Sequence, residues 1–180
     1  MHTRFSQVVW SSVPRRTAGK LLFYDRPLSA KSGHPLTQVY PVSNPTTYIH
    51  LVPESDRPTI AVGPSRFVVV IEAEVSYEWQ KLVSEWIVSS GCLYMMAWGR
   101  ECSSWDDSVD WANIDKFGDS PIPDDEFVVT TWHEDEPLKE VFWFSKTLAV
   151  HSSVDIVQTV VLDISVTSRE HELLSLYESA

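Results

Sequence analysis

The sequence predicts an α/β fold in which a mostly parallel sheet of four to five strands lies between two layers of helices. Short segments with the composition of buried strands, among them the continuous apolar run at 67–71, alternate four times with segments whose apolar residues recur at helical spacing. A continuous apolar run is typical of a strand covered on both faces, and helical crossovers between parallel strands provide that cover. The length of 180 residues fits one domain with an appended segment. These features favour a three-layer α/β/α domain of Rossmann-like or flavodoxin-like topology.

Four segments have the composition of buried strands, and they are 67–71, 92–97, 127–132 and 159–164. They are rich in β-branched and large apolar residues, which favour strands. We expect six of their side chains to be nearly fully buried: Val69, Ile71, Leu93, Met95, Val129 and Val161.

The helices are predicted from capping residues and apolar spacing. Ser76 is expected to cap the first helix, which ends at Gly91, and Ser103 or Ser104 to cap the second, placing Asp106 and Asp107 in its first turn. A third helix opens at Pro137, and a short terminal helix follows Ser168. The expected inward residues of the first helix are Trp79, Leu82, Val83, Trp86 and Ile87, those of the second are Trp105, Val109 and Ala112, and those of the third are Leu138, Val141, Phe142, Ser145 and Leu148.

The charge and proline content divide the chain into two parts. Residues 1–66 contain eight basic and three acidic residues and eight of the eleven prolines, whereas residues 67–180 contain six basic and 22 acidic residues. We therefore predict a basic, proline-rich N-terminal arm over residues 1–60, extended or partly disordered, and an α/β domain over residues 61–180. Within the arm, residues 47–52 have strand composition and could add a fifth strand at a sheet edge.

Composition excludes several classes of function. The formal net charge of −11 argues against nucleic acid as a partner of the acidic domain, and no apolar run is long enough to span a membrane. Six glycines leave no glycine-rich nucleotide loop, and no cofactor is expected. The two cysteines have neither metal-ligand spacing nor a disulfide framework, which fits a cytoplasmic location.

The candidate site lies beyond the second and third predicted strands, because open α/β sheets bind ligands at the carboxyl ends of their strands. Residues 98–107 and 132–137 both begin with a tryptophan and continue with ionisable residues that fold stability does not require.

These segments also carry a resemblance. The strings CLYMMAWG at 92–99, CSSWDDSVD at 102–110, TTWHEDEP at 130–137 and EVFWF at 140–144 resemble an uncharacterised bacterial domain family of unknown function. The resemblance covers roughly residues 67–164 and implies a bacterial intracellular domain, without an activity that could be transferred.

Three hypotheses for the site remain open, and two of them make the protein a hydrolase-like enzyme. In the first, Cys102 before a helix is a nucleophile, His133 is its base, and Glu134 or Asp135 orients the imidazole. The alternative for Cys102 is a packing role, and nearby Asp106 and Asp107 oppose activation of its thiol.

In the second hypothesis, acidic residues and His133 bind Mg²⁺ or Mn²⁺, although the spacing of known metal motifs is absent and a solvated acidic face accounts for the same residues. The candidate ligands are Asp106, Asp107, Asp110, His133, Glu134, Asp135 and Glu136.

The third hypothesis is a protein-binding surface, and we favour it because it needs no motif that the sequence lacks. Residues 101–140 contain 13 acidic and two basic residues, which would attract a partner with a basic surface. Tryptophan and arginine are common at binding hot spots, although tryptophans packed in the core would be the structural alternative. The candidate binding residues are Trp98, Arg100, Trp105, Trp132 and Glu134. The sequence thus favours an acidic accessory or protein-binding module.

Overall fold

The computed structural model describes residues 44–60 and 63–180. Most of the predicted N-terminal arm, residues 1–43, lies outside these residues. The described residues all belong to one compact unit, Pro41–Ala180.

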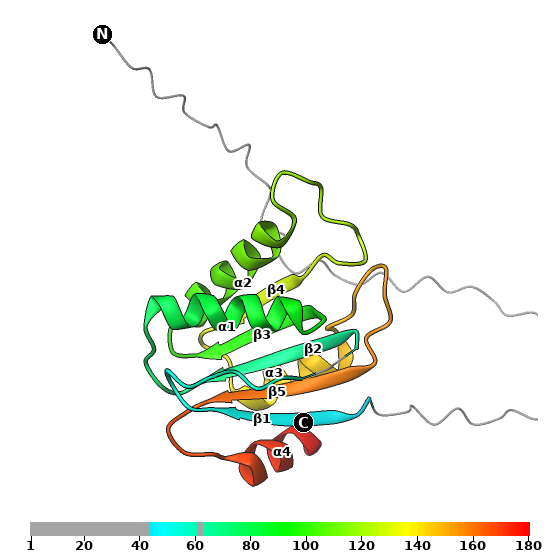
Figure 1. Ribbon diagram of the computed structural model, residues 1–180. Helices are drawn as coiled ribbons and strands as arrows, with labels where there is room; N and C mark the ends of the chain where they lie inside the picture. Colours follow the sequence, from blue (N-terminus) through cyan, green and yellow to red (C-terminus); the bar gives the residue numbers. More distant parts are fainter. Residues whose placement is uncertain (1–43, 61–62) are drawn as a thin grey trace, which may run out of the picture. The chain divides into compact units, whose positions relative to one another are not determined.

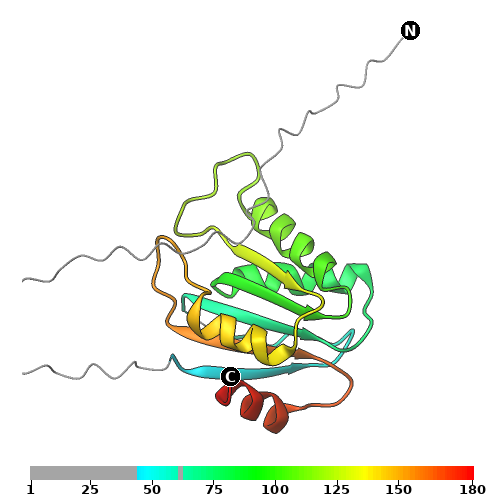
Figure 2. The same ribbon diagram turned by 180° about the vertical axis from the view of Figure 1, so that it is seen from behind.

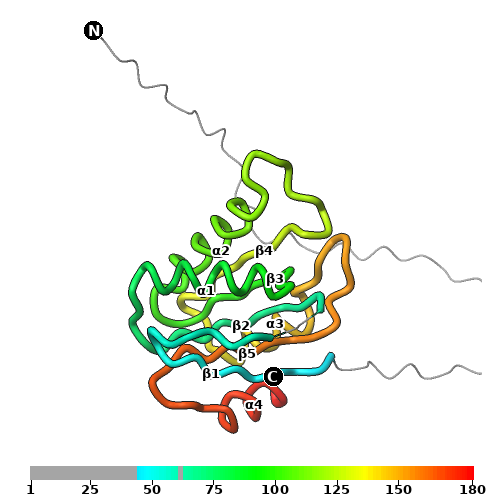
Figure 3. The backbone as a smooth tube through the Cα atoms, viewed as in Figure 1, coloured from blue at the N-terminus to red at the C-terminus, as the bar shows by residue number. Residues whose placement is uncertain are grey.

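A five-stranded, fully parallel sheet forms the centre of this unit (Figure 1). The strands lie in the order β1-β5-β2-β3-β4. Their bounds are Thr46–Leu51 for β1, Ser65–Ile71 for β2, Cys92–Gly99 for β3, Val129–His133 for β4 and Gln158–Ile164 for β5. The chain runs outward from β2 to β4 and then crosses to β5 on the other side of β2 (Figure 3). The reversal of strand order therefore lies between β2 and β5.

Helices cover both faces of the sheet, which confirms the predicted α/β fold (Figures 1 and 2). Their bounds are Tyr77–Ser89 for α1, Cys102–Phe117 for α2, Leu138–Thr147 for α3 and Glu170–Glu178 for α4. Helices α1 and α2 pack on one face and α3 and α4 on the other, so two separate apolar clusters form. Alternate residues of each strand enter opposite clusters, as the pleat requires.

Five of the six strand residues predicted to be buried are so; the sixth, Val129, is only half-buried. Among the described residues β4 pairs with β3 alone, and Val129 is its first residue. An edge strand has one neighbour fewer, so its side chains lose cover on the open side. The prediction for Val129 was therefore wrong, because the strand order was not known.

Helix α1 begins as predicted, since the Ser76 hydroxyl accepts a hydrogen bond from the backbone N–H of Trp79 at 3.2 Å. Leu82, however, is 45% exposed, contrary to the prediction. The side of α1 that packs against α2 is polar: Gln80 and Ser84 are buried there and bond to serines of α2. Apolar spacing cannot predict a buried face that consists of polar residues. The prediction for Leu82 was therefore wrong, because this residue lies outside that face.

Helix α2 begins earlier than predicted. It starts at Cys102, after Glu101, whose φ of 49° places it in the left-handed region. Neither Ser103 nor Ser104 is the cap, and Asp106 therefore lies in the second turn. The expected inward residues of α2 are buried as predicted. In α3 the prediction failed only at Leu148, which is 52% exposed because the helix ends before it.

Strand β1 forms the edge expected of residues 47–52, and it pairs with β5 over its whole length. The sheet thus includes residues on the N-terminal side of the expected boundary at residue 61. Within the described part of the chain, no helix is both long and apolar enough to cross a membrane.

Candidate functional site

The carboxyl ends of β3 and β4 lie side by side, with Trp98 opposite His133 in the register. After Trp98 the chain turns at Gly99, which has a φ of 102°. A Cβ atom at residue 99 would lie 2.3 Å from the carbonyl oxygen of Ile71 in β2, so only glycine fits this close approach. The turn leads directly into α2.

His133 belongs to a cluster on the face covered by α3. Its Nδ1 lies 3.0 Å from a carboxylate oxygen of Glu136, and its Nε2 lies 3.1 Å from the Thr131 hydroxyl. The ring packs edge-on against Phe144, with the centroids 5.4 Å apart. The Trp98 indole donates a hydrogen bond of 2.6 Å to the backbone carbonyl of Glu136. Both imidazole nitrogens are thus engaged, and the side chain is buried.

Cys102 lies on the opposite face of the sheet, in the cluster beneath α1 and α2. Its sulfur accepts a hydrogen bond from the backbone N–H of His133, and burial raises the pKa of the thiol. The structure therefore brings Cys102 close to the backbone of His133, while the imidazole points to the other face. A proton transfer from this thiol to this ring has no direct path in the observed arrangement.

A second polar cluster joins α2 to β4 on the Cys102 face. The Thr130 hydroxyl donates a hydrogen bond of 2.8 Å to Asp110 and also contacts Asp106. Asp106 is buried, and its Oδ1 has no hydrogen-bond partner. Burial raises the pKa of Asp106 to about 6, assisted by the negative charges of Asp110 and Asp107. The pKa of Asp110 is also raised, by partial desolvation beside β4 and by the charge of Asp107, although the residue is exposed.

The candidate metal ligands are spread over several surfaces. Asp106 and Asp110 face β4, Asp107 is exposed elsewhere on α2, and Asp135 is exposed in the loop after β4. Within residues 44–60 and 63–180, no group of three or more His, Cys, Asp and Glu side chains is arranged to hold a metal ion. His133 and Asp106 lie on opposite faces of the sheet, so these two candidate ligands do not converge on one site.

The candidate binding residues differ in their exposure. Trp105 is 1% exposed and packs edge-on against Trp79, as expected of an inward residue of α2, so its indole offers no exposed surface to a partner. Trp98 is half-buried. Arg100 is exposed and lies 3.8 Å from Glu74. Trp132 is 54% exposed on the edge strand, and Glu134 is exposed just after it.

One polar network was missed by the sequence reasoning, and it lies at the reversal of strand order. Asp163 in β5 is fully buried and accepts a 2.7 Å hydrogen bond from the Tyr48 hydroxyl. Arg169, just before α4, contacts Asp163 at 3.5 Å and Glu72 at 3.1 Å. An aspartate within an otherwise apolar strand was the available signal, because a buried carboxylate requires partners. This network connects β1, β2, β5 and α4.

The described residues form a three-layer, parallel α/β domain, with the His133 cluster on one face of β4 and the cluster of Asp106, Asp110 and Thr130 on the other. The chain belongs to a domain family of unknown function, DUF7684, whose model matches residues 46–180. The matched region begins at the first residue of β1 and contains every described helix and strand. No curated protein and no solved structure matches the chain.

Proposed function

We propose that this protein is an accessory, protein-binding module whose acidic edge, formed by β4 and the loop that follows it, binds a partner with a basic surface. The observation that carries the proposal is the exposure of Trp132 on an edge strand. A tryptophan that is 54% exposed leaves much of a large apolar ring in water, and such residues are typical anchors of protein interfaces. The next residue, His133, is buried and anchors the end of the strand that carries Trp132.

The charge around Trp132 supports a basic partner. Glu134, Asp135 and Glu136 follow after His133 and are all exposed. Acidic residues at the rim of an interface accelerate association with a basic surface and reject acidic ones, and the effect weakens with salt. The same field would repel nucleic acid, which supports a protein rather than a nucleic acid as the partner we propose.

The unpaired edge of β4 can also offer backbone hydrogen bonds to a partner. Among the described residues β4 pairs with β3 only, so its outward N–H and C=O groups are available to an extended segment of the partner. The Trp132 side chain lies beside this edge on the α2 face, since Thr130 and Trp132 share one side of the strand. A basic, extended segment could therefore bind along β4 with an apolar contact on Trp132.

The location we propose is the bacterial cytoplasm. Cys92 and Cys102 are both buried and unpaired, as suits a reducing compartment. The resemblance of the tryptophan-containing strings to a bacterial family supports the same proposal.

Site-specific photo-crosslinking tests the proposal. A photoreactive phenylalanine analogue replaces Trp132 in one variant and Val150, which is 70% exposed, in the control. Both proteins are irradiated in native cell extract. We expect position 132 to crosslink one defined protein through a basic segment, with excess unlabelled wild-type protein suppressing the product. Crosslinking of the same mixture of proteins from both positions, or of none, would contradict the proposal.

A further inference from the structure

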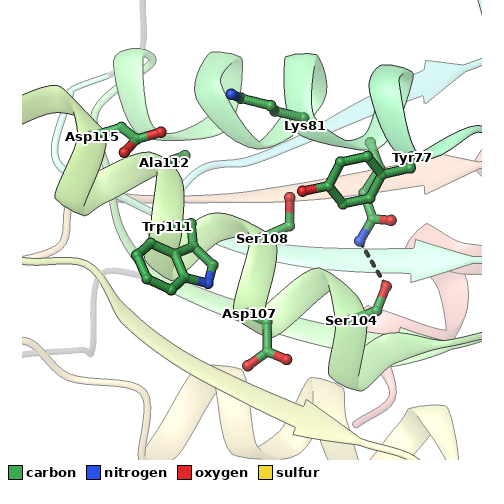
Figure 4. Close-up of a pocket in the computed structure, with 9 residues that line it drawn as sticks. Tyr77, Lys81, Ser104, Asp107, Ser108, Trp111, Ala112 and Asp115 are labelled. Carbon is green, nitrogen blue, oxygen red and sulfur yellow. Dashed lines mark hydrogen bonds between the residues drawn. The ribbon is translucent and has the colours of Figure 1, made fainter. Parts of the chain in front are cut away.

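A groove of about 410 Å³ runs between α1 and α2; none of its lining residues belongs to β4, and the site described above does not use it (Figure 4). One wall comes from α1 and contains Tyr77 and Lys81; the other comes from α2 and contains Asp107, Trp111 and Asp115. Tyr77 is 72% exposed and Trp111 is 60% exposed. Each wall of the groove therefore presents one largely exposed aromatic ring.

The α2 wall has a regular arrangement. Asp107, Trp111 and Asp115 are four residues apart and lie in one row along the helix, so the indole is flanked by a carboxylate on each side, as Figure 4 shows. The floor consists of Ser104, Ser108 and Ala112, which form the neighbouring row. Small residues there leave room above the helix backbone, and the groove results from this pattern.

Hydrogen bonds between the helices fix the width of the groove. The Gln80 amide donates to the Ser104 hydroxyl at 2.8 Å, and the Ser84 and Ser108 hydroxyls are 2.9 Å apart. Gln80 and Ser84 are buried, so these bonds are shielded from water. The two walls are therefore held in place before any ligand arrives, which lowers the entropic cost of binding.

The side chains that line the groove favour a planar cation as the ligand. An indole face attracts a cation, and a guanidinium can stack on the ring while its N–H groups bond to carboxylates in the same plane. A lysine ammonium lacks the planar shape and the second set of donors. Lys81 is the one cation among the lining residues, and it lies 3.9 Å from Glu85 on its own helix, whereas Asp107 and Asp115 form no ion pair with the described residues.

We propose that this groove binds the guanidinium of an arginine side chain presented by a protein partner, with Trp111 as the stacking surface and Asp107 and Asp115 as acceptors. The presence of a partner rests on the proposed function, but the groove itself can be tested without one. The lining carries two acids and one base, and residues 44–180 contain 24 acidic and eight basic residues. This charge is complementary to an arginine-bearing segment.

The test is an NMR titration of the isotope-labelled full chain with N-acetyl-arginine methylamide. We expect saturable shifts of the Trp111 indole N–H and of the Ser108 and Ala112 amides. The isosteric, uncharged citrulline derivative should cause none of these shifts, and the lysine derivative should bind more weakly. Trp111→Ala and Asp107→Asn should each weaken arginine binding about fivefold, whereas Trp143→Ala and Asp119→Asn should leave it unchanged.

Three outcomes would overturn the inference. Equal binding of lysine and arginine would show a response to charge alone, and shifts confined to residues 131–136 would place the cation at the β4 edge instead. Shifts of the groove residues that depend on protein concentration without any added probe would show that a second copy of the chain fills the groove. Crosslinking from position 132 is measured in a separate experiment and does not require the groove, so the two proposals can fail separately.

Discussion

Replacing Asp106 with asparagine should stabilise the folded protein at neutral pH. The carboxyl group of Asp106 is buried between α2 and β4, its Oδ1 has no hydrogen-bond partner, and its pKa is raised to about 6 from 3.8, chiefly by burial. Asparagine keeps the shape and the oxygen that contacts Thr130 but carries no charge, and Asp110 can accept a bond from its amide. The variant therefore removes the cost of burying an anion.

The magnitude follows from the pKa. A difference between 3.8 and about 6, at about 1.4 kcal/mol per unit, corresponds to about 3 kcal/mol when the carboxylate is fully ionised. Because the pKa is higher in the folded than in the unfolded chain, the protonated form favours folding. This contribution is fully present below about pH 4 and is lost as the pH rises through about 6. We therefore expect Asp106→Asn to gain about 2–3 kcal/mol over wild type at pH 8, and almost nothing at pH 4.

Urea denaturation followed by circular dichroism at pH 4, 6 and 8 measures this difference in free energy of unfolding. Asp107→Asn is the matched control, since Asp107 is exposed on the same helix, and its effect should stay within about 0.5 kcal/mol at each pH. If Asp106→Asn were equally destabilising at pH 4 and pH 8, the carboxylate would not be buried as an uncompensated charge, and the reasoning would be refuted.

The remaining predictions concern the core, the network at β5 and the N-terminal segment. Leu162→Ala should cost about 2–5 kcal/mol because the side chain is fully buried in β5, whereas Leu148→Ala, at a position 52% exposed, should cost far less; thermal denaturation compares them. Tyr48→Phe removes the 2.7 Å hydrogen bond to buried Asp163 and should cost about 1–3 kcal/mol in chemical denaturation, and a neutral result would show that Asp163 needs no such partner. Deleting residues 1–40 should leave cooperative unfolding intact, whereas deleting residues 1–52 removes β1 and should abolish it; scanning calorimetry would contradict this if both truncations behaved alike.

The fold could be predicted because its strands are covered on both faces. Segments such as 67–71 and 92–97 are apolar throughout, which is typical of strands covered by helices on both sides, and this signal is local to each strand. The order of the strands is a property of the whole sheet and left no local signal. Val129 shows the consequence, since its burial depends on whether β4 is a central or an edge strand.

The candidate site was predicted less well, because residues that are close in the sequence can point to opposite faces of the sheet. Trp132 and His133 are neighbours in the sequence, yet the pleat directs one toward α2 and the other toward α3. Which face receives α2 depends on the crossover from β3 and on the strand order. Trp105 was ambiguous for a related reason, because a tryptophan in an amphipathic helix has the same local pattern whether it fills a core or anchors a partner.

The central claim is that the edge at β4 binds a basic partner through Trp132 and the acidic residues after it. The most direct measurement is the affinity of this protein for the purified partner that crosslinking identifies. Isothermal titration calorimetry compares wild type with Trp132→Ala, Glu134→Lys and the control Trp143→Ala. Trp143 is 47% exposed, on the opposite face. We expect Trp132→Ala to weaken binding at least about tenfold. Glu134→Lys should weaken it at low salt and reduce its salt dependence, and the control should bind like wild type. Equal affinities for wild type and Trp132→Ala, or binding insensitive to salt, would contradict the account.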